Sequence, residues 1–195
     1  MRTIQTEPLT HETFAPFGNF YVMTKPDGYS LNGEIHRFFP DRISESYGTR
    51  VGFSPILVKK PEQMKVTQVE YHTTTPEMIL PLNDDMILHV APASAGIPVT
   101  HLTRAFLVPK GTLVKINTAI WHLAPLPAEA EELQAMIILP ECTYANDCTV
   151  VDLKEEEQFV IKNELYLKKC LSILQEKVYS NSNRIEKPKR RESGG

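Results

Sequence analysis

The chain has 195 residues, of which 42% are hydrophobic and 23% are charged, and its formal net charge is −3. A chain of this size buries enough apolar surface to fold as one domain without staples, and its charge excludes the strongly basic surface of a nucleic-acid-binding protein. Three cysteines without a Cys-x-x-Cys pair exclude a disulfide framework and a zinc knuckle, and because the sequence has no signal-peptide core and no membrane-length apolar run, we expect a cytoplasmic protein with no membrane partner.

The residues up to 155 predict short strands joined by turns. Prolines, 15 in all, interrupt the apolar runs, and such interruptions favour short strands over long helices. Thr10 is the expected N-cap of one helical turn over 11–15, and residues 25–48 are expected to form a loop or an irregular arm. Strands are expected at 19–23, 50–58, 65–72, 77–82, 86–91, 102–108, 112–116, 133–139 and 148–153. Strands of this length and spacing are typical of a sandwich or a barrel.

The pattern changes after residue 155. An apolar stripe with helical spacing predicts a helix over 156–179 that packs on its own chain; the stripe consists of Leu167, Cys170, Leu171, Leu174 and Val178. Residues 180–195 are rich in Ser, Asn and charge, and they predict a disordered tail. The expected organisation is therefore a β-barrel domain at 1–155, the helix at 156–179 and the tail at 180–195.

The first segment that suggests chemistry runs from Glu70 to Glu77. Residues two apart on a strand point to the same face, so Glu70 and His72 are expected to project together. Four residues of turn separate His72 from Glu77, which opens the next strand. A strand, a short turn and a returning strand would bring Glu77 beside His72.

The second segment runs from Gly111 to His122. A glycine begins a strand, a turn of small residues follows, and His122 comes directly after that turn. If this strand lies next to the first two, His122 faces Glu77 and His72 at the mouth of a barrel. Either histidine alone would be interpreted as a hydrogen-bonded core residue, but the two segments together favour a functional site.

The spacing of both segments resembles the two sequence motifs of cupins. The first motif is His-x-His, four residues, Glu, six residues, Gly, and its positions are occupied here by Glu70, His72, Glu77 and Asp84. The second is Gly, five residues, Pro-x-Gly, two residues, His, and its positions are occupied by Gly111, Asn117, Ala119 and His122. The resemblance implies a mainly β, cupin-type antiparallel barrel or jelly roll, to which the C-terminal helix is added.

The cupin resemblance also implies a divalent metal, held here by His72, Glu77 and His122. Imidazole and carboxylate ligands together suit Mn, Fe, Co, Ni or Zn, and the sequence does not choose among them. Glu70 replaces the first histidine of the motif and so changes the ligand set. A site without metal is the alternative.

A narrower resemblance, over residues 3–153, is to ureidoglycolate lyases. It is carried by the opening at 7–18 and by the segments Glu70–His72, Thr103–Phe106, Trp121–Pro125 and Asn146–Cys148. The family implies a carbon–nitrogen lyase of the amidine-lyase type, which releases urea from ureidoglycolate and leaves glyoxylate in purine and allantoin degradation. We therefore expect a small-molecule substrate, and also a homodimer, because small barrels with exposed strand edges often pair through them.

The lyase reaction implies roles for particular residues. The expected catalytic residues are Glu70, His72, Glu77 and His122, with Glu70 free to act as general acid or base. A metal would bind the carboxylate and hydroxyl oxygens of the substrate. The further substrate-binding candidates are Arg104 and Lys115, as cations for the substrate carboxylate, and Trp121, as a packing lid over the site.

Two other functions stay open from the sequence. A metal-dependent sugar isomerase or epimerase would share the barrel and the metal. A non-catalytic cupin that binds a small ligand would share the cavity and return its ligand unchanged. Fold alone does not decide among the three, because one fold hosts many chemistries.

Overall fold

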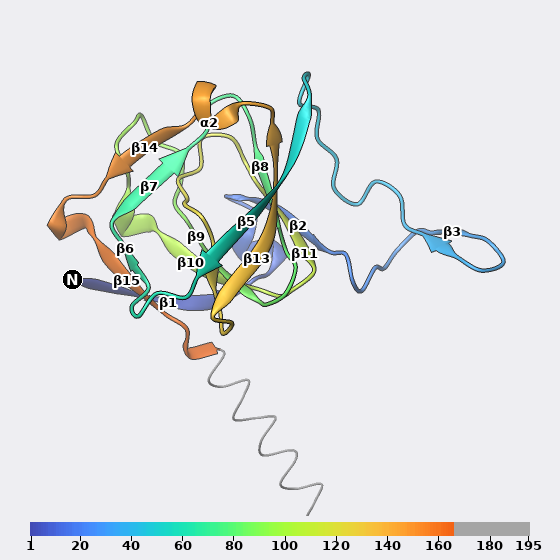
Figure 1. Cartoon of the computed structure of the whole chain (residues 1–195), viewed down its shortest axis with the longest axis horizontal. Coiled ribbons are helices and arrows are strands. Elements are labelled where there is room, and N and C mark those ends of the chain that lie inside the picture. Colours follow the sequence, from blue (N-terminus) through green and yellow to red (C-terminus); the bar gives the residue numbers. More distant parts are fainter. Residues whose placement is uncertain (166–195) are drawn as a thin grey trace, which may run out of the picture. The chain divides into compact units, whose positions relative to one another are not determined.

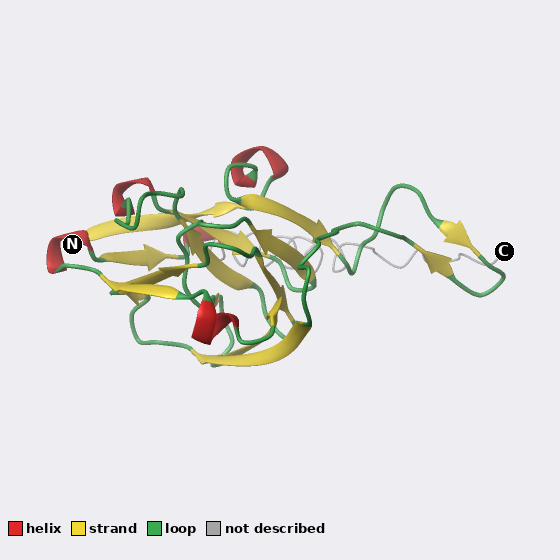
Figure 2. Cartoon of the chain, turned by 90° about the horizontal axis from the view of Figure 1, so that it is seen from above, coloured by secondary structure: helices red, strands yellow, loops and turns green. Residues whose placement is uncertain are grey.

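Short β-strands, paired in two larger sheets, make up most of the computed structural model, which describes residues 1–165 of the chain (Figure 1). The six-stranded sheet has the order β12 (Leu126–Pro127), β9 (Met86–Val90), β10 (Arg104–Val108), β1 (Arg2–Pro8), β15 (Phe159–Lys162) and β6 (Lys65–Val66). The five-stranded sheet has the order β2 (Gly18–Val22), β11 (Thr112–Ile116), β8 (Glu77–Pro81), β13 (Glu132–Pro140) and β5 (Val51–Lys59). The expected mainly β fold is confirmed, and Figure 2 shows the strands in curved layers.

Strand β1 is the exception to antiparallel pairing. It lies parallel to β10 on one side and to β15 on the other, whereas the remaining pairs in the two sheets are antiparallel. Neither β1 nor β15 was expected as a strand. The sequence of β1 is mostly polar, and its only large apolar side chain is that of Ile4. Pairing on both edges with strands distant in sequence holds it in place.

Two hydrophobic cores lie on opposite faces of β9 and β10. The first core lies between the two sheets and includes Leu88, Phe106 and Ile137. The second includes Ile87, Ala105, Trp121 and Phe159. Successive residues of a strand point to opposite faces, so β9 supplies both cores, and every one of its residues is buried. Burial of one large aliphatic side chain contributes about 1.5–3 kcal/mol.

A smaller two-stranded sheet joins β7 (Gln68–Tyr71) to β14 (Thr149–Asp152). Residues 121–122 connect this sheet to β9, because Trp121 forms a bridge with Ala91 and His122 forms a bridge with Glu70. This segment directly follows the turn that ends β11. The two sequence segments singled out above are therefore hydrogen-bonded neighbours.

The arm at 25–48 contains a hairpin of two short strands, β3 (Leu31–Asn32) and β4 (Arg37–Phe38). It lies apart from the two larger sheets in both views (Figures 1 and 2). The end of the arm returns to the outer face of the five-stranded sheet, where Ile43 and Tyr47 pack on a small cluster around Met78 and Ile138. The expected irregular arm thus contains one short hairpin.

Helices are few and short within residues 1–163: α1 (His11–Phe14), α2 (Thr143–Asn146), and the 3₁₀ turns η1 (Thr100–Leu102) and η2 (Glu155–Glu157). The expected N-cap of α1 is confirmed, because the Thr13 amide donates to Thr10 Oγ1 at 3.1 Å. No helix in this part of the chain has the length and apolar character needed to cross a membrane.

The helix expected over 156–179 is wrong for its first part. Residues 155–157 form η2, and residues 159–162 form β15, which pairs with β1 and β6. The run Phe159-Val160-Ile161 is aromatic and β-branched, which favours a strand. Residues 1–163 form one compact unit, so the barrel domain extends beyond the expected boundary at 155. The remainder of the expected helix from residue 166, and the expected disordered tail at 180–195, lie outside the described residues.

Candidate active site

Four side chains that are distant in sequence converge at one end of the first core. One potential ligand atom from each of Glu70, His72, Glu77 and His122 lies within 4.8 Å of the others. Their positions follow from the pairing of the strands: β7 ends just before His72, β8 begins at Glu77, and the bridge between Glu70 and His122 sets these two residues opposite each other. The convergence predicted for His72, Glu77 and His122 is therefore found.

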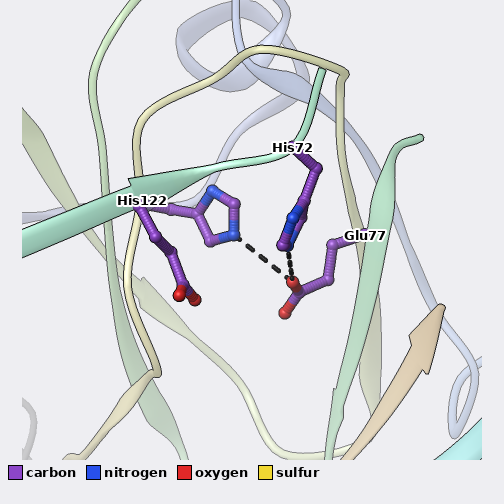
Figure 3. A group of neighbouring side chains, drawn as sticks. His72, Glu77 and His122 are labelled. Carbon is purple, nitrogen blue, oxygen red and sulfur yellow. Dashed lines mark hydrogen bonds and ion pairs between the residues drawn. The ribbon is translucent and has the colours of Figure 1, made fainter. Parts of the chain in front are cut away.

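The carboxylate of Glu77 is the centre of this group. Its Oε2 lies 3.0 Å from His72 Nε2 and 3.3 Å from His122 Nε2. Figure 3 shows both imidazole rings turned toward this one oxygen. The exposed fractions of the three residues are 3% or less, so bulk water does not solvate them.

Backbone carbonyls fix the orientation of both imidazole rings. His72 Nδ1 lies 2.7 Å from the carbonyl oxygen of Asp147, and His122 Nδ1 lies 2.8 Å from that of Ile120. A carbonyl oxygen only accepts hydrogen bonds, so each Nδ1 must carry a proton. In a neutral imidazole each Nε2 then presents a lone pair to the Glu77 oxygen, which is also an acceptor. The repulsion between these acceptors is relieved only if the Nε2 atoms are protonated or if a cation lies between the two Nε2 atoms and the Glu77 oxygen.

The charges of this group are strongly coupled. Burial raises the pKa of Glu77, but hydrogen bonds and charge from His122 and His72 outweigh it, and the pKa falls to about 2. Burial is the largest single effect and lowers the pKa of both histidines, but the hydrogen bond to Glu77, a backbone hydrogen bond and the charge of Glu77 together outweigh it, and the net pKa of each lies above its usual value. A positive charge on His122 lowers the pKa of His72, because two imidazolium ions at this spacing repel each other.

The donor set suits a divalent metal. Two imidazole nitrogens whose other nitrogens donate to carbonyls, together with a buried carboxylate, form the arrangement that protein metal sites commonly use. One divalent cation would satisfy both lone pairs and the carboxylate charge at once. Glu70 offers a fourth potential ligand atom, a second carboxylate oxygen, and its Oε2 accepts from Cys148 Sγ at 3.3 Å. The residues therefore fit the expected metal, and they do not distinguish Mn, Fe, Co, Ni and Zn.

Three of the expected site residues lie elsewhere. Arg104 donates to both carboxylate oxygens of Glu7 on the neighbouring strand and to the carbonyl of Thr13. Lys115 alternates along β11 with core residues and pairs with Glu45 of the arm at 2.9 Å. Neither cation is brought to the four-residue group.

Trp121 also points away from this group. Its ring is 1% exposed, belongs to the second core and packs on Tyr71 at a centroid distance of 4.4 Å. Its Nε1 donates to Ser94 Oγ at 2.8 Å. Because neighbouring residues of a strand face opposite sides, a buried Trp121 directs His122 toward the site. The ring thus packs in the second core and is not a lid over the site.

The segment around α2 contributes residues that the sequence pattern did not assign to the site. The ring of Tyr144 lies 6.1 Å from that of His72 with an edge-to-face geometry. Burial and the charges of Glu77 and Glu70 raise the pKa of Tyr144, so its hydroxyl keeps its proton. The one signal in the sequence was the family resemblance of Asn146–Cys148, which gave no role to any of these residues.

A cavity of about 340 Å³ lies beside Tyr144, between α2 and the inner faces of β5 and β13. Its lining includes Ser54, Ile137, Leu139 and Thr143. Among the residues of 1–165 that line it there is no lysine or arginine. None of Glu70, His72, Glu77 and His122 is among the described residues that line it.

Comparisons with known proteins place this geometry in a family context. The family model described as ureidoglycolate lyase matches residues 1–161. A ureidoglycolate lyase of Pseudomonas fluorescens (strain Pf0-1) is 26% identical over 165 residues, which are 83% of this chain and 98% of that protein. One of Pseudomonas aeruginosa (strain UCBPP-PA14) is 26% identical over 167 residues, which are 83% and 96% of the two chains.

Two solved structures are similar to the chain at low identity and low TM-score. A dTDP sugar isomerase of Desulfovibrio desulfuricans G20 has a TM-score of 0.42 and 9% identity, and the match covers 73% of this chain and 89% of that one. A mutant of Bacillus subtilis oxalate decarboxylase has a TM-score of 0.38 and 19% identity, and the match covers 54% and 24% of the two chains.

Proposed function

The chain belongs to the ureidoglycolate lyase family, and from this premise we propose that it cleaves ureidoglycolate to urea and glyoxylate, or a similar small hydroxy acid, as a carbon–nitrogen lyase of the amidine-lyase type. The observation that carries the proposal is the convergence of two imidazole Nε2 atoms on one buried carboxylate oxygen. The ring of Tyr144, which packs edge-to-face on the ring of His72, also borders a cavity of about 340 Å³, a size typical of small-ligand pockets.

The reaction sets three chemical demands. Ureidoglycolate carries a hydroxyl and a ureido nitrogen on the same carbon, beside a carboxylate. The hydroxyl loses its proton, its electron pair forms the carbonyl of glyoxylate, the carbon–nitrogen bond breaks, and the urea nitrogen takes up a proton. The site must therefore bind a carboxylate, lower the pKa of a hydroxyl and provide an acid for the leaving nitrogen.

We assign the first two demands to a divalent metal held by His72, Glu77 and His122. Such a metal supplies a Lewis acid that binds oxygens and lowers the pKa of the hydroxyl. The carbonyls of Asp147 and Ile120 keep both Nε2 lone pairs directed inward for this purpose. The metal identity stays open among Mn, Fe, Co, Ni and Zn.

The third demand falls to Glu70. It belongs to the same four-residue group and is 9% exposed. Its carboxylate would take the hydroxyl proton and return it to the urea nitrogen, so the proton moves from oxygen to nitrogen with no net change. The Tyr144 hydroxyl, which stays protonated, is a neutral donor at the edge of the site.

The test combines product release with metal analysis. Purified protein with ureidoglycolate should release glyoxylate well above the spontaneous rate after loading with one of the five metals. His72→Ala and Glu77→Ala should lose both the metal and the turnover, whereas His101→Ala, at an exposed histidine of η1, should keep both. Absence of glyoxylate release under every metal condition would overturn the proposal.

The working form of the protein is proposed to be a cytoplasmic homodimer. Strand β5 is an edge of the five-stranded sheet, and its Phe53 and Leu57 are 67% and 62% exposed. Apolar side chains on an exposed sheet edge favour association with a second copy. Cys142 and Cys148 are free thiols, which suits a reducing compartment. Sedimentation of wild type and of a Phe53→Ser, Leu57→Ser variant tests the dimer, which the variant should weaken.

A further inference from the structure

Helix α2 and the turn that follows it make three contacts with residues of the site. The backbone carbonyl of Asp147 accepts from His72 Nδ1. The thiol of Cys148 donates to Glu70. The ring of Tyr144, three residues earlier, packs against the ring of His72. A segment more than seventy residues away in sequence thus borders two of the four residues in the group.

The carboxylate of Asp147 acts on the loop between two of the proposed metal ligands. Oδ1 accepts from the backbone N–H of Thr73 at 2.7 Å and from its hydroxyl. Oδ2 accepts from the backbone N–H of Thr74 at 2.8 Å and from its hydroxyl at 2.5 Å. Four donors on one ionised carboxylate form charge-assisted hydrogen bonds, which are shorter and stronger than neutral ones.

The loop that these hydrogen bonds hold connects two of the proposed metal ligands. His72 precedes the loop, and Glu77 follows it after only four residues. The loop is partly exposed and has no regular secondary structure, so it has no repeating helix or strand hydrogen bonds to fix its shape. A carboxylate that holds its first two residues therefore sets the separation between His72 Nε2 and the Glu77 oxygen.

We propose that Asp147 is a positioning residue that fixes the spacing and ring orientation of the first two metal ligands, through its carboxylate for the loop and through its carbonyl for His72. The proposal rests on the metal-binding role of His72 and Glu77 given above. Asp147 itself contacts no substrate atom in this scheme. Its side chain determines how tightly the site holds a metal, and hence how it holds the substrate oxygens.

The experiment measures Mn²⁺ binding by metal-free, full-length protein from the electron paramagnetic resonance signal of free Mn²⁺. In Asp147→Asn one acceptor oxygen becomes an NH₂ group, so two of the four hydrogen bonds are lost. We expect the variant to bind Mn²⁺ about 10–100-fold more weakly, as for other partners of metal ligands. Thr74→Val, which loses one donor, should give a smaller loss, and Thr74→Ser should restore wild-type binding.

Asp152→Asn is the matched control. This carboxylate also accepts a side-chain hydrogen bond near the same small sheet, from Gln68 Nε2 at 2.8 Å, but it touches no member of the group. Its Mn²⁺ affinity should stay within about twofold of wild type. Thermal midpoints of the metal-free proteins separate positioning from general destabilisation. Equal Mn²⁺ affinity for Asp147→Asn and wild type would overturn the proposal, even if the midpoint falls.

A second readout does not depend on metal. Nitrogen-15 spectra of the metal-free protein report which ring nitrogen carries the proton. Nδ1 of His72 should carry a proton throughout in wild type, and in Asp147→Asn the fraction of Nδ1 that is protonated should fall. His122, whose Nδ1 faces the carbonyl of Ile120, is the internal control and should not change. If wild-type protein bound no metal, the metal-dependent part of the proposed function would be rejected. An unchanged His72 spectrum in Asp147→Asn would separately reject the positioning role.

Discussion

Glu70 and His122 face each other in an isolated antiparallel bridge, in which each backbone N–H donates to the other residue's carbonyl, at 2.7 and 2.8 Å. Residues directly opposite in such a pair project their side chains to the same face. The bridge therefore sets a carboxylate beside an imidazole before any side-chain contact is formed. One hydrogen-bonded pair between two short segments thus fixes half of the four-residue group.

Replacement of the central carboxylate should separate metal binding from folding. Glu77→Gln keeps the shape of the side chain and removes the charge that both imidazoles face. We expect metal content in the purified protein to fall below detection and kcat to fall by at least about 100-fold, the scale of one lost electrostatic contact at a reacting centre. Glu132→Gln, at the start of β13, is the control and should retain both. A variant with normal metal content would contradict the assigned ligand set.

Stability should depend on pH through His89. Burial, and secondly the charge of His122, lower the pKa of this histidine to about 3, whereas an unfolded histidine titrates near 6.5. Below pH 6.5 His89 takes up a proton in the unfolded chain, whereas in the folded protein it stays neutral down to about pH 3. The contribution of neutral His89 to the free energy of unfolding is therefore fully present above pH 6.5. It decreases by about 1.4 kcal/mol for each pH unit as the pH falls from 6.5 toward 3.

Urea unfolding between pH 7 and pH 5 measures this slope. In His89→Gln the slope should decrease by about one proton, whatever the absolute stability of the variant. His36→Gln, at an exposed position of the arm, provides the comparison. A slope that His89→Gln leaves unchanged would show that this histidine is protonated in the folded protein.

Trp121 should contribute to stability through its ring and, to a smaller extent, through its N–H. Trp121→Ala should cost about 3–5 kcal/mol, as for large side chains removed from a core. Loss of the bond between Nε1 and Ser94 Oγ should cost about 0.5–1.5 kcal/mol in Trp121→Phe and in Ser94→Ala, and Ser94→Ala also loses the bond from Ser94 Oγ to the carbonyl of Ile97. A double-mutant cycle measured by chemical denaturation isolates that bond, and additive losses would show that it contributes nothing.

Arg104 should matter for folding and not for substrate binding. Its guanidinium binds both oxygens of Glu7 and the carbonyl of Thr13 in a partly exposed setting. Arg104→Lys loses the planar fork, so we expect a loss of about 1 kcal/mol in unfolding free energy with KM unchanged. If KM for ureidoglycolate instead rose tenfold or more while stability stayed constant, Arg104 would be a substrate ligand after all.

Local signals predict most strands of this fold but not its long-range contacts. Prolines and turn residues mark the strand ends, and the spacing from His72 to Glu77 is short enough for one turn to bring them together. By contrast, Asp147 lies 75 residues from His72, and Arg104 lies 97 residues from Glu7. No periodicity in a single sequence connects residues that far apart, so the support for His72 and the true partner of Arg104 became visible only in the fold.

Parity along a strand explains why other expectations differed from the structure. The sequence shows that Lys115 alternates with Val114 and Ile116, but it does not show which face of β11 is covered by the opposite sheet. The structure turns Val114 and Ile116 into the first core, so Lys115 faces the arm and pairs with Glu45. A separate choice of face at residues 121–122 buries Trp121 in the second core and directs His122 to the site.

Strand β9 belongs to both hydrophobic cores, and this affects how the protein unfolds. A strand whose every residue is packed on one side or the other ties the two halves of the unit together, so neither half can lose its order while the other keeps it. Loss of structure should therefore be cooperative across residues 1–163. The amides of β9 would exchange with solvent only when the whole unit opens, and hence among the slowest in the chain.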